Sequence, residues 1–158
     1  MDTPSLQLRL LQAETYLAIE RILRSVKQRM ETRFEAEGLS DVTPQQAKVL
    51  LLLFQEKRAV TGQELSEKLA LSAVTVSRFL RALEDNQWVE RERDPRDARA
   101  SLIRPTEKAY KALPQFIRVS NELMDEVFGH LPNEAFHQFA ESVSLVQHQL
   151  SALESSDG

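Results

Sequence analysis

Hydrophobic residues recur at helical spacing over most of this chain. The first such stretch covers about residues 6–36, and Gly38 lies where a helix stop is expected. A second stretch begins with Thr43 as its cap and runs through Phe54 or Gln55, apolar on almost every side. This pattern predicts a long helix followed by a buried central helix.

The C-terminal third predicts two further helices. The first is capped by Thr106 and runs to about Gly129, with a bend expected at Pro114. The second covers about residues 133–153 and repeats its apolar residues in strict 3-4-3-4-3 spacing, a heptad seam. Its members are Phe136, Phe139, Val143, Val146, Leu150 and Leu153. We expect this seam to form a dimer interface, because little of the chain remains to cover it; an intrachain core contact is the alternative.

Two short helices separated by a tight turn lie between these regions. Thr61 and Glu64 form a capping box at the start of the first, which extends to about Leu69. Ser72 can cap the second, which covers about residues 73–86. This arrangement predicts a helix-turn-helix, whose second helix enters the major groove of DNA.

The second of these helices has two contrasting faces. The side expected to enter a core carries four apolar residues, Val76, Phe79, Leu80 and Leu83. The other side combines arginines, hydroxyls and one small apolar group, which can contact guanine, phosphate and the thymine methyl. Together with the starts of both helices, the expected DNA contacts are Thr61, Gln63, Ser72, Val74, Thr75, Ser77, Arg78 and Arg81. The alternative is the solvated face of an ordinary amphipathic helix.

A hairpin, or wing, is predicted over about residues 88–104. Its turn begins at Asp94 and the proline after it, because Asp can bond its own backbone and Pro presets φ. The loop displays Arg96 and Arg99, with Asp94 and Asp97 close enough to orient their guanidinium groups. An arginine at a loop tip suits a narrow minor groove, so Asp94, Arg96 and Arg99 join the expected contacts. A salt-bridged surface hairpin is the alternative.

These residues resemble the multiple antibiotic resistance regulator (MarR) family of winged-helix transcription factors. The resemblance rests on LSAVTVSR at residues 71–78, LE at residues 83–84 followed by WVER at residues 88–91, DPRDAR at residues 94–99 and TEKA at residues 106–109. The wing motif followed by this helix start carries most of the specificity, because a helix-turn-helix alone does not separate regulator families.

Two departures from the family pattern concern the local backbone. Gln87 stands where the family has a glycine, so we expect Asn86 to take the left-handed conformation there. Pro105 and Ala109 replace the family's usual leucine and glycine, which alters the expected path after the wing.

The resemblance implies a mainly α fold with a small β-hairpin wing. It implies a winged helix-turn-helix lobe at residues 40–111 and a helical dimerisation region at residues 1–36 and 112–158. It also implies a homodimeric repressor that binds a pseudo-palindromic operator in double-stranded DNA and uses no cofactor. A small amphipathic or aromatic effector would bind between the two lobes, lined by Tyr16, Ile19, Leu23, Phe54 and Phe116. Core packing is the alternative for each of these five.

The charge distribution qualifies the acidic total of −4. Residues 57–111 hold 12 Lys or Arg against 9 Asp or Glu, whereas residues 112–158 hold one Arg against seven acids. Phosphate binding needs a locally basic surface rather than a basic total. The predicted DNA-binding segment has that surface, and the acidic C-terminal segment is expected to lie away from DNA.

Several other functions find little support in the sequence. The chain has no cysteine, which excludes a disulfide framework or a thiol switch. We expect a cytoplasmic protein, because neither a secretory signal nor an apolar run of membrane-spanning length is present. No phosphate loop or nucleophile motif indicates an enzyme. His137, Glu141 and His148 share a helix face that could bind a metal, with solvated surface as the alternative. A winged helix that binds an acidic protein remains the alternative to DNA binding.

Overall fold

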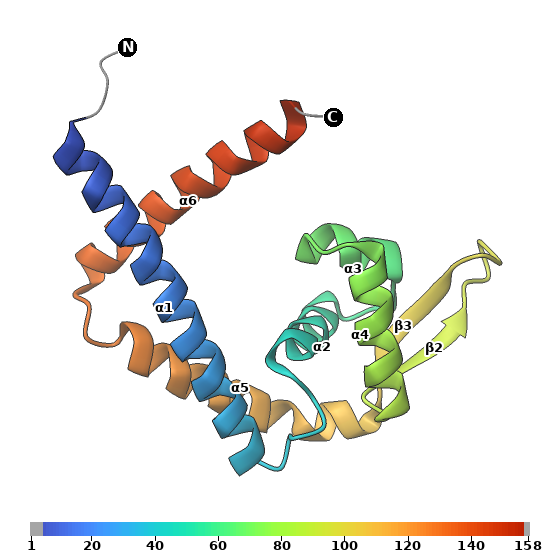
Figure 1. Ribbon diagram of the computed structural model, residues 1–158. Helices are drawn as coiled ribbons and strands as arrows, with labels where there is room; N and C mark the ends of the chain where they lie inside the picture. The colour runs from blue at the N-terminus through green and yellow to red at the C-terminus, as the bar shows by residue number, and fades with distance from the viewer. Residues whose placement is uncertain (1–4, 157–158) are drawn as a thin grey trace. The chain divides into compact units, whose positions relative to one another are not determined.

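The computed structural model describes residues 5–156, and its contacts fall into two compact units divided between Val119 and Ser120. Figure 1 labels the helices and the strands β2 and β3. In order they are α1 (Leu6–Ala36), α2 (Pro44–Glu56), β1 (Val60–Thr61), α3 (Gly62–Leu69), α4 (Ala73–Asp85), β2 (Val89–Arg93), β3 (Ser101–Pro105), α5 (Glu107–Phe128) and α6 (Asn133–Ser156). The first unit contains everything up to Val119, and α5 continues from it into the second.

Helix α2 is the central helix of the first unit. Thr43 caps it through a complete capping box with Gln46, and Pro44 occupies its first turn. Val49, Leu50 and Leu53 are fully buried, as the nearly all-round apolar pattern predicts.

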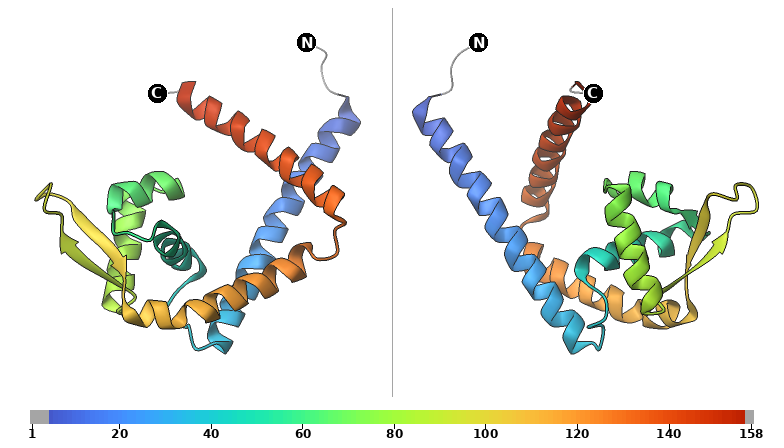
Figure 2. Two further views of the ribbon diagram at one scale, coloured as in Figure 1. Left: turned by 180° about the vertical axis from the view of Figure 1, so that it is seen from behind. Right: turned by 45° about the vertical axis from the view of Figure 1, so that its right-hand side comes forward.

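A small antiparallel sheet carries the wing. The strand order is β1-β3-β2, with β3 in the centre. Val60 of β1 pairs with Ile103, and Arg91 of β2 pairs with the same residue from the other side. The sequence pattern did not predict β1, because two residues are too few to show strand alternation. The hairpin of β2 and β3 extends past α3 and α4 in both views of Figure 2.

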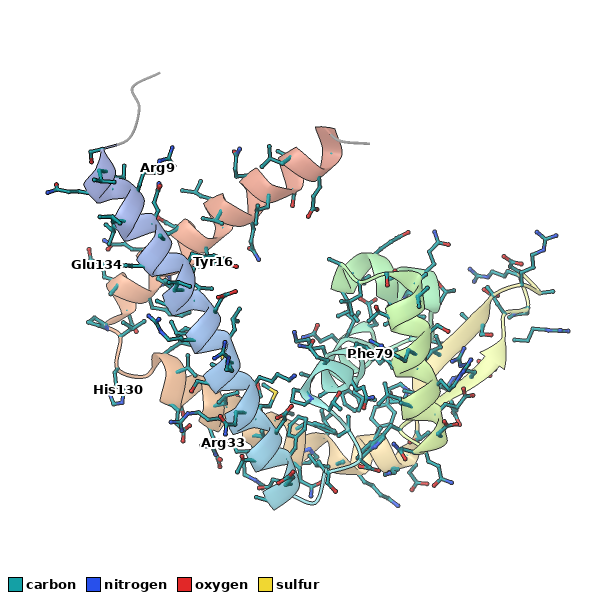
Figure 3. All side chains as sticks on the ribbon, viewed as in Figure 1. Arg9, Tyr16, Arg33, Phe79, His130 and Glu134 are labelled. Atoms are coloured by element: carbon teal, nitrogen blue, oxygen red, sulfur yellow. The ribbon has the colours of Figure 1, made fainter. Side chains whose placement is uncertain are left out.

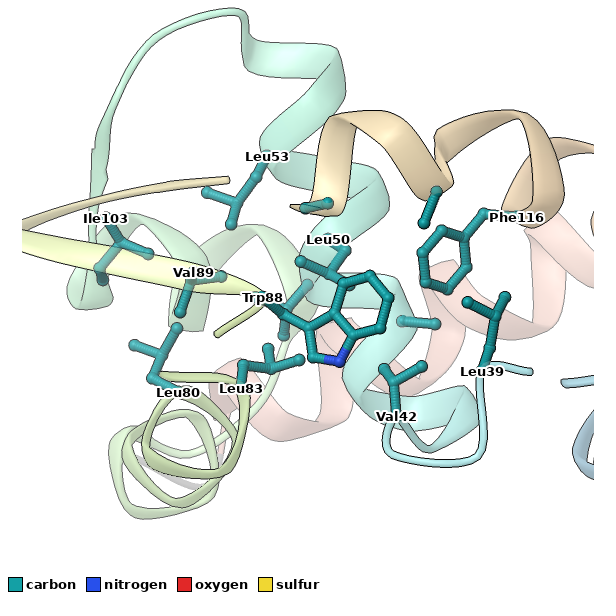
Figure 4. Packing of buried hydrophobic residues seen from close by; sticks show 14 of the residues in the cluster. Leu39, Val42, Leu50, Leu53, Leu80, Leu83, Trp88, Val89, Ile103 and Phe116 are labelled. Atoms are coloured by element: carbon teal, nitrogen blue, oxygen red, sulfur yellow. The ribbon is translucent and has the colours of Figure 1, made fainter. Parts of the chain in front are cut away.

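The core of the first unit is built around two aromatic rings (Figure 4). Trp88, the only tryptophan in the chain, is 2% exposed and lies 5.6 Å from the ring of Phe116 at an interplanar angle of 72°. Phe34, near the end of α1, meets Phe116 edge-on at 5.6 Å. Edge-to-face contacts of this kind add to the free energy gained by burying the rings. They tie α1, α5 and the start of the wing into one hydrophobic core.

The turn after α4 corrects one expectation from the sequence. Asn86 has φ −90°, and Gln87 takes the left-handed conformation itself, with φ +61°. The backbone N–H of Gln87 donates to Glu84 O (2.9 Å) and that of Trp88 donates to Leu83 O (2.7 Å). This pair of bonds is a Schellman motif, which places the left-handed residue one position later than we expected. Gln87 therefore occupies the left-handed position at which the sequence resemblance led us to expect a glycine.

The path after the wing is regular despite the other two departures. Pro105 ends β3 opposite Val89, and Ala109 is fully buried in the first turn of α5. Pro114 lies within α5, which runs without a break to Phe128. Pro105 and Ala109 are therefore both compatible with the fold.

The second unit consists of the end of α5 and all of α6. Phe128 packs against Phe136 and Phe139, with ring centroids 5.2 Å and 6.3 Å apart. Beyond this contact the seam of α6 is open to solvent: Val143 is 39% exposed, Val146 61% and Leu150 55%. Among the described residues, no helix combines the length and the hydropathy of a membrane span.

Candidate nucleic-acid interface

Local capping positions the first helix of the helix-turn-helix. The backbone N–H of Glu64 donates to Thr61 Oγ1 (3.2 Å), and Glu64 Oε2 accepts from the backbone N–H of Thr61 (2.8 Å). Arg58 Nη2 lies 2.7 Å from Glu64 Oε1. The hydrogen bond from Arg58 lowers the pKa of Glu64 to about 2, with help from the Thr61 backbone bond. Gln63 is thereby held exposed in the first turn of α3.

Helix α4 has the two faces that the sequence predicts. Ser72 caps it by accepting a hydrogen bond from the backbone N–H of Thr75 (3.1 Å), and its hydroxyl donates to Thr75 Oγ1 (2.9 Å). The buried side carries Val76, Leu80 and Leu83, with Phe79 only partly buried (labelled in Figure 3). The exposed side carries Val74, Ser77, Arg78 and Arg81. The Arg78 guanidinium lies 5.7 Å from the Phe79 ring centroid, and Val74, at 80%, is the most exposed large hydrophobic residue described.

The wing loop is ordered through its backbone. Asp94 Oδ1 accepts from the backbone N–H of Arg96 and Asp97 Oδ1 from that of Arg99, both at 2.9 Å. The carboxylates thus bind main-chain groups rather than the guanidinium groups that the sequence led us to expect, because an Asx turn satisfies the aspartate two residues away. The side chains of Arg96 and Arg99 are exposed at the end of the hairpin.

A groove of about 530 Å³ lies between α4 and the wing. Five of the expected DNA-contact residues line it, namely Thr61, Gln63, Ser77, Asp94 and Arg99. Arg96 instead lines a second groove of about 540 Å³, together with Arg58 and Leu102. Arg96 and Arg99 of the wing loop therefore line different grooves. Val74, Arg78 and Arg81 lie on the exposed face of α4 and are not among the residues that line either groove.

Arg91 is a basic residue of the first groove that the sequence pattern did not indicate. It lines the groove from β2, and its Nε lies 2.9 Å from Glu84 Oε2 on α4. Strand alternation places Arg91 on the same face as the buried Val89. That alternation was the available signal, and it was obscured by the run of charged residues in this strand.

The residues expected to line an effector pocket occupy different environments within the first unit. Phe116 is 2% exposed in the aromatic core, and Phe54 is half-buried with its ring 5.4 Å from that of Tyr110. Ile19 and Leu23 are 49% and 63% exposed on α1. Tyr16, labelled in Figure 3, donates its hydroxyl hydrogen to Glu20 (2.9 Å), and this hydrogen bond raises the pKa of Tyr16.

The predicted seam and the candidate metal face both lie on α6. Phe136 is 36% exposed, Phe139 48% and Leu153 51%. His137, Glu141 and His148 are exposed on the same helix. Among residues 5–156, no three histidine or carboxylate side chains are grouped closely enough to hold a metal ion.

Comparisons with known proteins give a family match and a fold match. Residues 42–101 match the sequence model described as the MarR family, whose members are transcriptional regulators rather than enzymes. A search of curated proteins by sequence found no match.

Solved structures resemble this chain over most of its length. A MarR transcriptional regulator from Methanosarcina mazei Go1 is 21% identical with a TM-score of 0.75, over 89% of this chain and 99% of that one. A mutant MarR from E. coli complexed with operator DNA is 22% identical with a TM-score of 0.74, over 90% and 99%. The S. aureus MepR–DNA complex is 24% identical with a TM-score of 0.76, over 85% and 96%. The chain therefore has the winged-helix fold of these regulators.

Proposed function

We propose that this chain, which carries a MarR family domain at residues 42–101, binds double-stranded DNA in a sequence-specific manner and regulates transcription. The observation that carries the proposal is the exposed face of α4, where Arg78 and Arg81 stand beside Ser77 and Val74 next to the groove of the wing. Arginine can bond guanine bidentately in the major groove, and hydroxyls reach bases or phosphates. The two DNA complexes with the same fold support this use of the surface.

The charge distribution supports phosphate binding by the same part of the chain. Residues 57–111 have an excess of three positive charges, whereas residues 112–158 have an excess of six negative charges. A duplex attracts the first segment and repels the second. We propose that residues 40–111 form the DNA-binding lobe and that Arg96 and Arg99 of the wing contact the DNA backbone or minor groove, with Asp94 ordering the loop that presents them.

The assembly that we propose is a homodimer acting as a repressor. The open seam of α6 and the exposed apolar residues of α1, such as Ile22 and Leu23, are the surfaces proposed to become covered. A two-fold dimer presents two recognition helices to a pseudo-palindromic operator. Bound at a promoter, such a dimer would exclude other proteins from the same DNA.

We also propose that a small aromatic or amphipathic effector controls this dimer. The apolar surface around Tyr16, Ile19 and Leu23 on α1 is the candidate contact, because it is exposed in the single chain. The test is operator binding in the presence of a panel of simple phenols and aromatic carboxylates. Release of DNA by a member of the panel, weakened by Tyr16→Ala, supports the effector; no release by any member argues against this class.

The experiment that tests DNA binding starts by selecting a preferred duplex from a random-sequence pool. Affinity for that duplex and for a shuffled duplex is then measured over a range of salt concentrations, because phosphate neutralisation gives a linear log–log dependence. Arg78→Ala should weaken binding to the selected duplex by about 1–3 kcal/mol and reduce discrimination between the two duplexes. Arg24→Ala, which removes the same charge from the exposed surface of α1, is the matched control.

Two outcomes would contradict the proposal. If the protein binds neither duplex at low salt, the basic face serves another purpose, and the winged-helix module for an acidic protein partner becomes the better interpretation. If it binds both duplexes equally and Arg78→Ala matches Arg24→Ala, binding is not sequence-specific.

A further inference from the structure

The beginning of α5 holds the exit of the recognition helix α4 through three successive backbone carbonyls. Asn86 O accepts a hydrogen bond from Lys108 Nζ (2.7 Å), and Gln87 O accepts one from Thr106 Oγ1 (2.7 Å). Trp88 O accepts from the backbone N–H of Thr106 (3.1 Å). Each residue of the chain leaving α4 is therefore bonded to one of two residues at the start of α5.

The side chain of Lys108 also contacts parts of the chain that these three hydrogen bonds do not reach. Its ammonium group lies 2.8 Å from Asp41 Oδ2 in the loop between α1 and α2, and 4.1 Å from the ring centroid of Trp88. The side-chain amide of Asn86 donates to Asp41 O (3.0 Å), which closes the arrangement. One cation thus contacts the α1–α2 loop, the carbonyl end of α4 and the aromatic residue at the start of the wing.

The chemistry of these contacts suits a lysine. A positive charge at the C-terminal end of a helix interacts favourably with the free carbonyls and the helix dipole. The face of an indole ring attracts a cation placed over it. The ammonium has three N–H donors that can turn toward separate acceptors, whereas a neutral side chain could not serve the carboxylate, the carbonyl and the ring together.

We propose that Lys108 is a positioning residue, which fixes the C-terminal end of α4 and thereby the angle at which its N-terminal half meets the DNA. This inference rests on the proposed function. Helix α4 has 13 residues, so it is about 20 Å long, and a small rotation about its anchored end displaces Ser77 and Arg78. Contacts to base edges carry the sequence information, whereas phosphate contacts carry none, so a displaced recognition helix loses discrimination between sequences before it loses attraction to DNA.

The exposure of the contacts separates positioning from folding stability. The Lys108 side chain is 42% exposed and that of Asp41 37%. Ion pairs at this level of exposure contribute little to stability. Removal of the ammonium should therefore leave the protein folded, with its recognition helix less tightly held.

The chain offers a matched control on the same helix. Lys111 lies about one turn further along α5, is 75% exposed and pairs with Glu107 at 2.9 Å. Lys111→Met removes the same charge as Lys108→Met at a nearby position. Any effect that comes only from weaker attraction to phosphate should appear in both variants.

The experiment compares Lys108→Met and Lys111→Met with the unmodified full-length protein. The probes are the duplex selected by the unmodified protein and a shuffled duplex of equal length and composition. Lys108→Met should lower the ratio of the two affinities by about fivefold to tenfold, because specific binding suffers more than non-specific binding. Lys111→Met should lower both affinities alike and leave the ratio unchanged. Lys108→Arg should restore most of the ratio, since arginine keeps the charge, the donors and the ring contact.

Trp88 provides an independent readout in the absence of DNA. It is the only tryptophan, so a change in its emission after loss of the cation above its ring is assigned without ambiguity. We expect a shift in Lys108→Met and none in Lys111→Met, with both variants folded by circular dichroism. If Lys108→Met does not fold, Asp41→Asn takes the place of that variant in the same comparison, because it removes the charge of the carboxylate that pairs with Lys108.

The outcomes separate this inference from the proposed function. If the unmodified protein binds no duplex, DNA binding itself is wrong and the positioning role falls with it. If the unmodified protein discriminates between the duplexes and Lys108→Met does so equally well, only the positioning role is overturned. An unchanged Trp88 emission in Lys108→Met would show that the ammonium does not lie over the ring in solution.

Discussion

Helices α4 and α6 are both amphipathic, yet only α4 covers its apolar side with its own chain. The stripe of α4 is buried: Val76, Leu80 and Leu83 are at most 2% exposed. The equivalent stripe of α6 stays open beyond its contact with Phe128, with Val146 61% exposed. The same periodicity thus has two consequences. In α4 the apolar face completes the core of the winged-helix lobe, and in α6 it remains exposed, as the proposed dimer interface requires.

The largest expected effect comes from placing a charge in the open seam. Val146→Asp should convert the proposed dimer into monomers, because a buried unpaired carboxylate in an apolar interface is strongly unfavourable. Loss of bivalent contact should weaken binding to a palindromic duplex by roughly 10²-fold or more. Light scattering and DNA titration measure the two effects.

The opposite face of α6 provides the control for that experiment. His148→Asp adds a negative charge on the side turned away from the seam and should leave the mass and the affinity close to those of the unmodified protein. A Val146→Asp variant that remains dimeric would mean that the seam is not the interface.

The next effect concerns the covered face. Leu80 is 2% exposed in the core between α4 and the wing, so Leu80→Ala should cost about 2–5 kcal/mol of unfolding free energy through lost burial and a cavity. Val74→Ala, on the 80% exposed side of the same helix, should change stability by no more than about 0.5 kcal/mol. Urea unfolding followed by Trp88 fluorescence measures both. Equal costs for the two variants would contradict the assignment of faces.

The comparison of the two helices also marks how far the sequence could predict the structure. Helix starts were predicted well, because Thr43, Thr61 and Ser72 bond to backbone groups within three residues. Helical faces followed from periodicity alone. The covering of α6 could not be predicted in the same way, because its apolar pattern is compatible with an intrachain or an intermolecular partner.

The sequence-based predictions failed where the structure depends on contacts between residues far apart in the sequence, or on the hydrogen-bond partner of a single residue. The two-residue strand β1 exists only because Val60 pairs with Ile103, 43 positions away. Arg91 lines the first groove because β2 pairs with β3, and the charged residues beside Arg91 in the sequence hid the alternation of that strand. Asp94 was predicted to orient the guanidinium group of Arg96, whereas it accepts a hydrogen bond from the backbone N–H of that residue.

A smaller effect tests the capping that starts the helix-turn-helix. Glu64 has a folded pKa of about 2 against an ordinary value of 4.5, chiefly through Arg58. Its stabilisation is therefore fully present above about pH 4.5 and is lost as the pH falls through about 2. Glu64→Gln keeps the capping box but removes the charge. It should cost about 1 kcal/mol at pH 7, discounted for a side chain that is 33% exposed.

Unfolding of this variant at several pH values gives the check. The difference between Glu64→Gln and the unmodified protein should shrink toward zero near pH 2, while Glu90→Gln on β2 serves as an exposed carboxylate control. A difference that stays constant from pH 7 to pH 2 would show that the ion pair with Arg58 is not its source.

The smallest effect, of opposite sign, concerns the turn that ends α4. The left-handed conformation costs a residue other than glycine about 1–2 kcal/mol. Substitution by glycine removes this strain, but it also makes the unfolded chain more flexible, which costs roughly 0.5–1 kcal/mol. Gln87→Gly, at φ +61°, should therefore stabilise the protein by about 0.5 kcal/mol. Asn86→Gly should destabilise it instead, because Asn86 has φ −90° and its side chain bonds Asp41 O. Urea midpoints at one protein concentration decide between them. The reverse order would mean that the left-handed position is Asn86 after all, and that the Schellman motif of α4 does not form in solution.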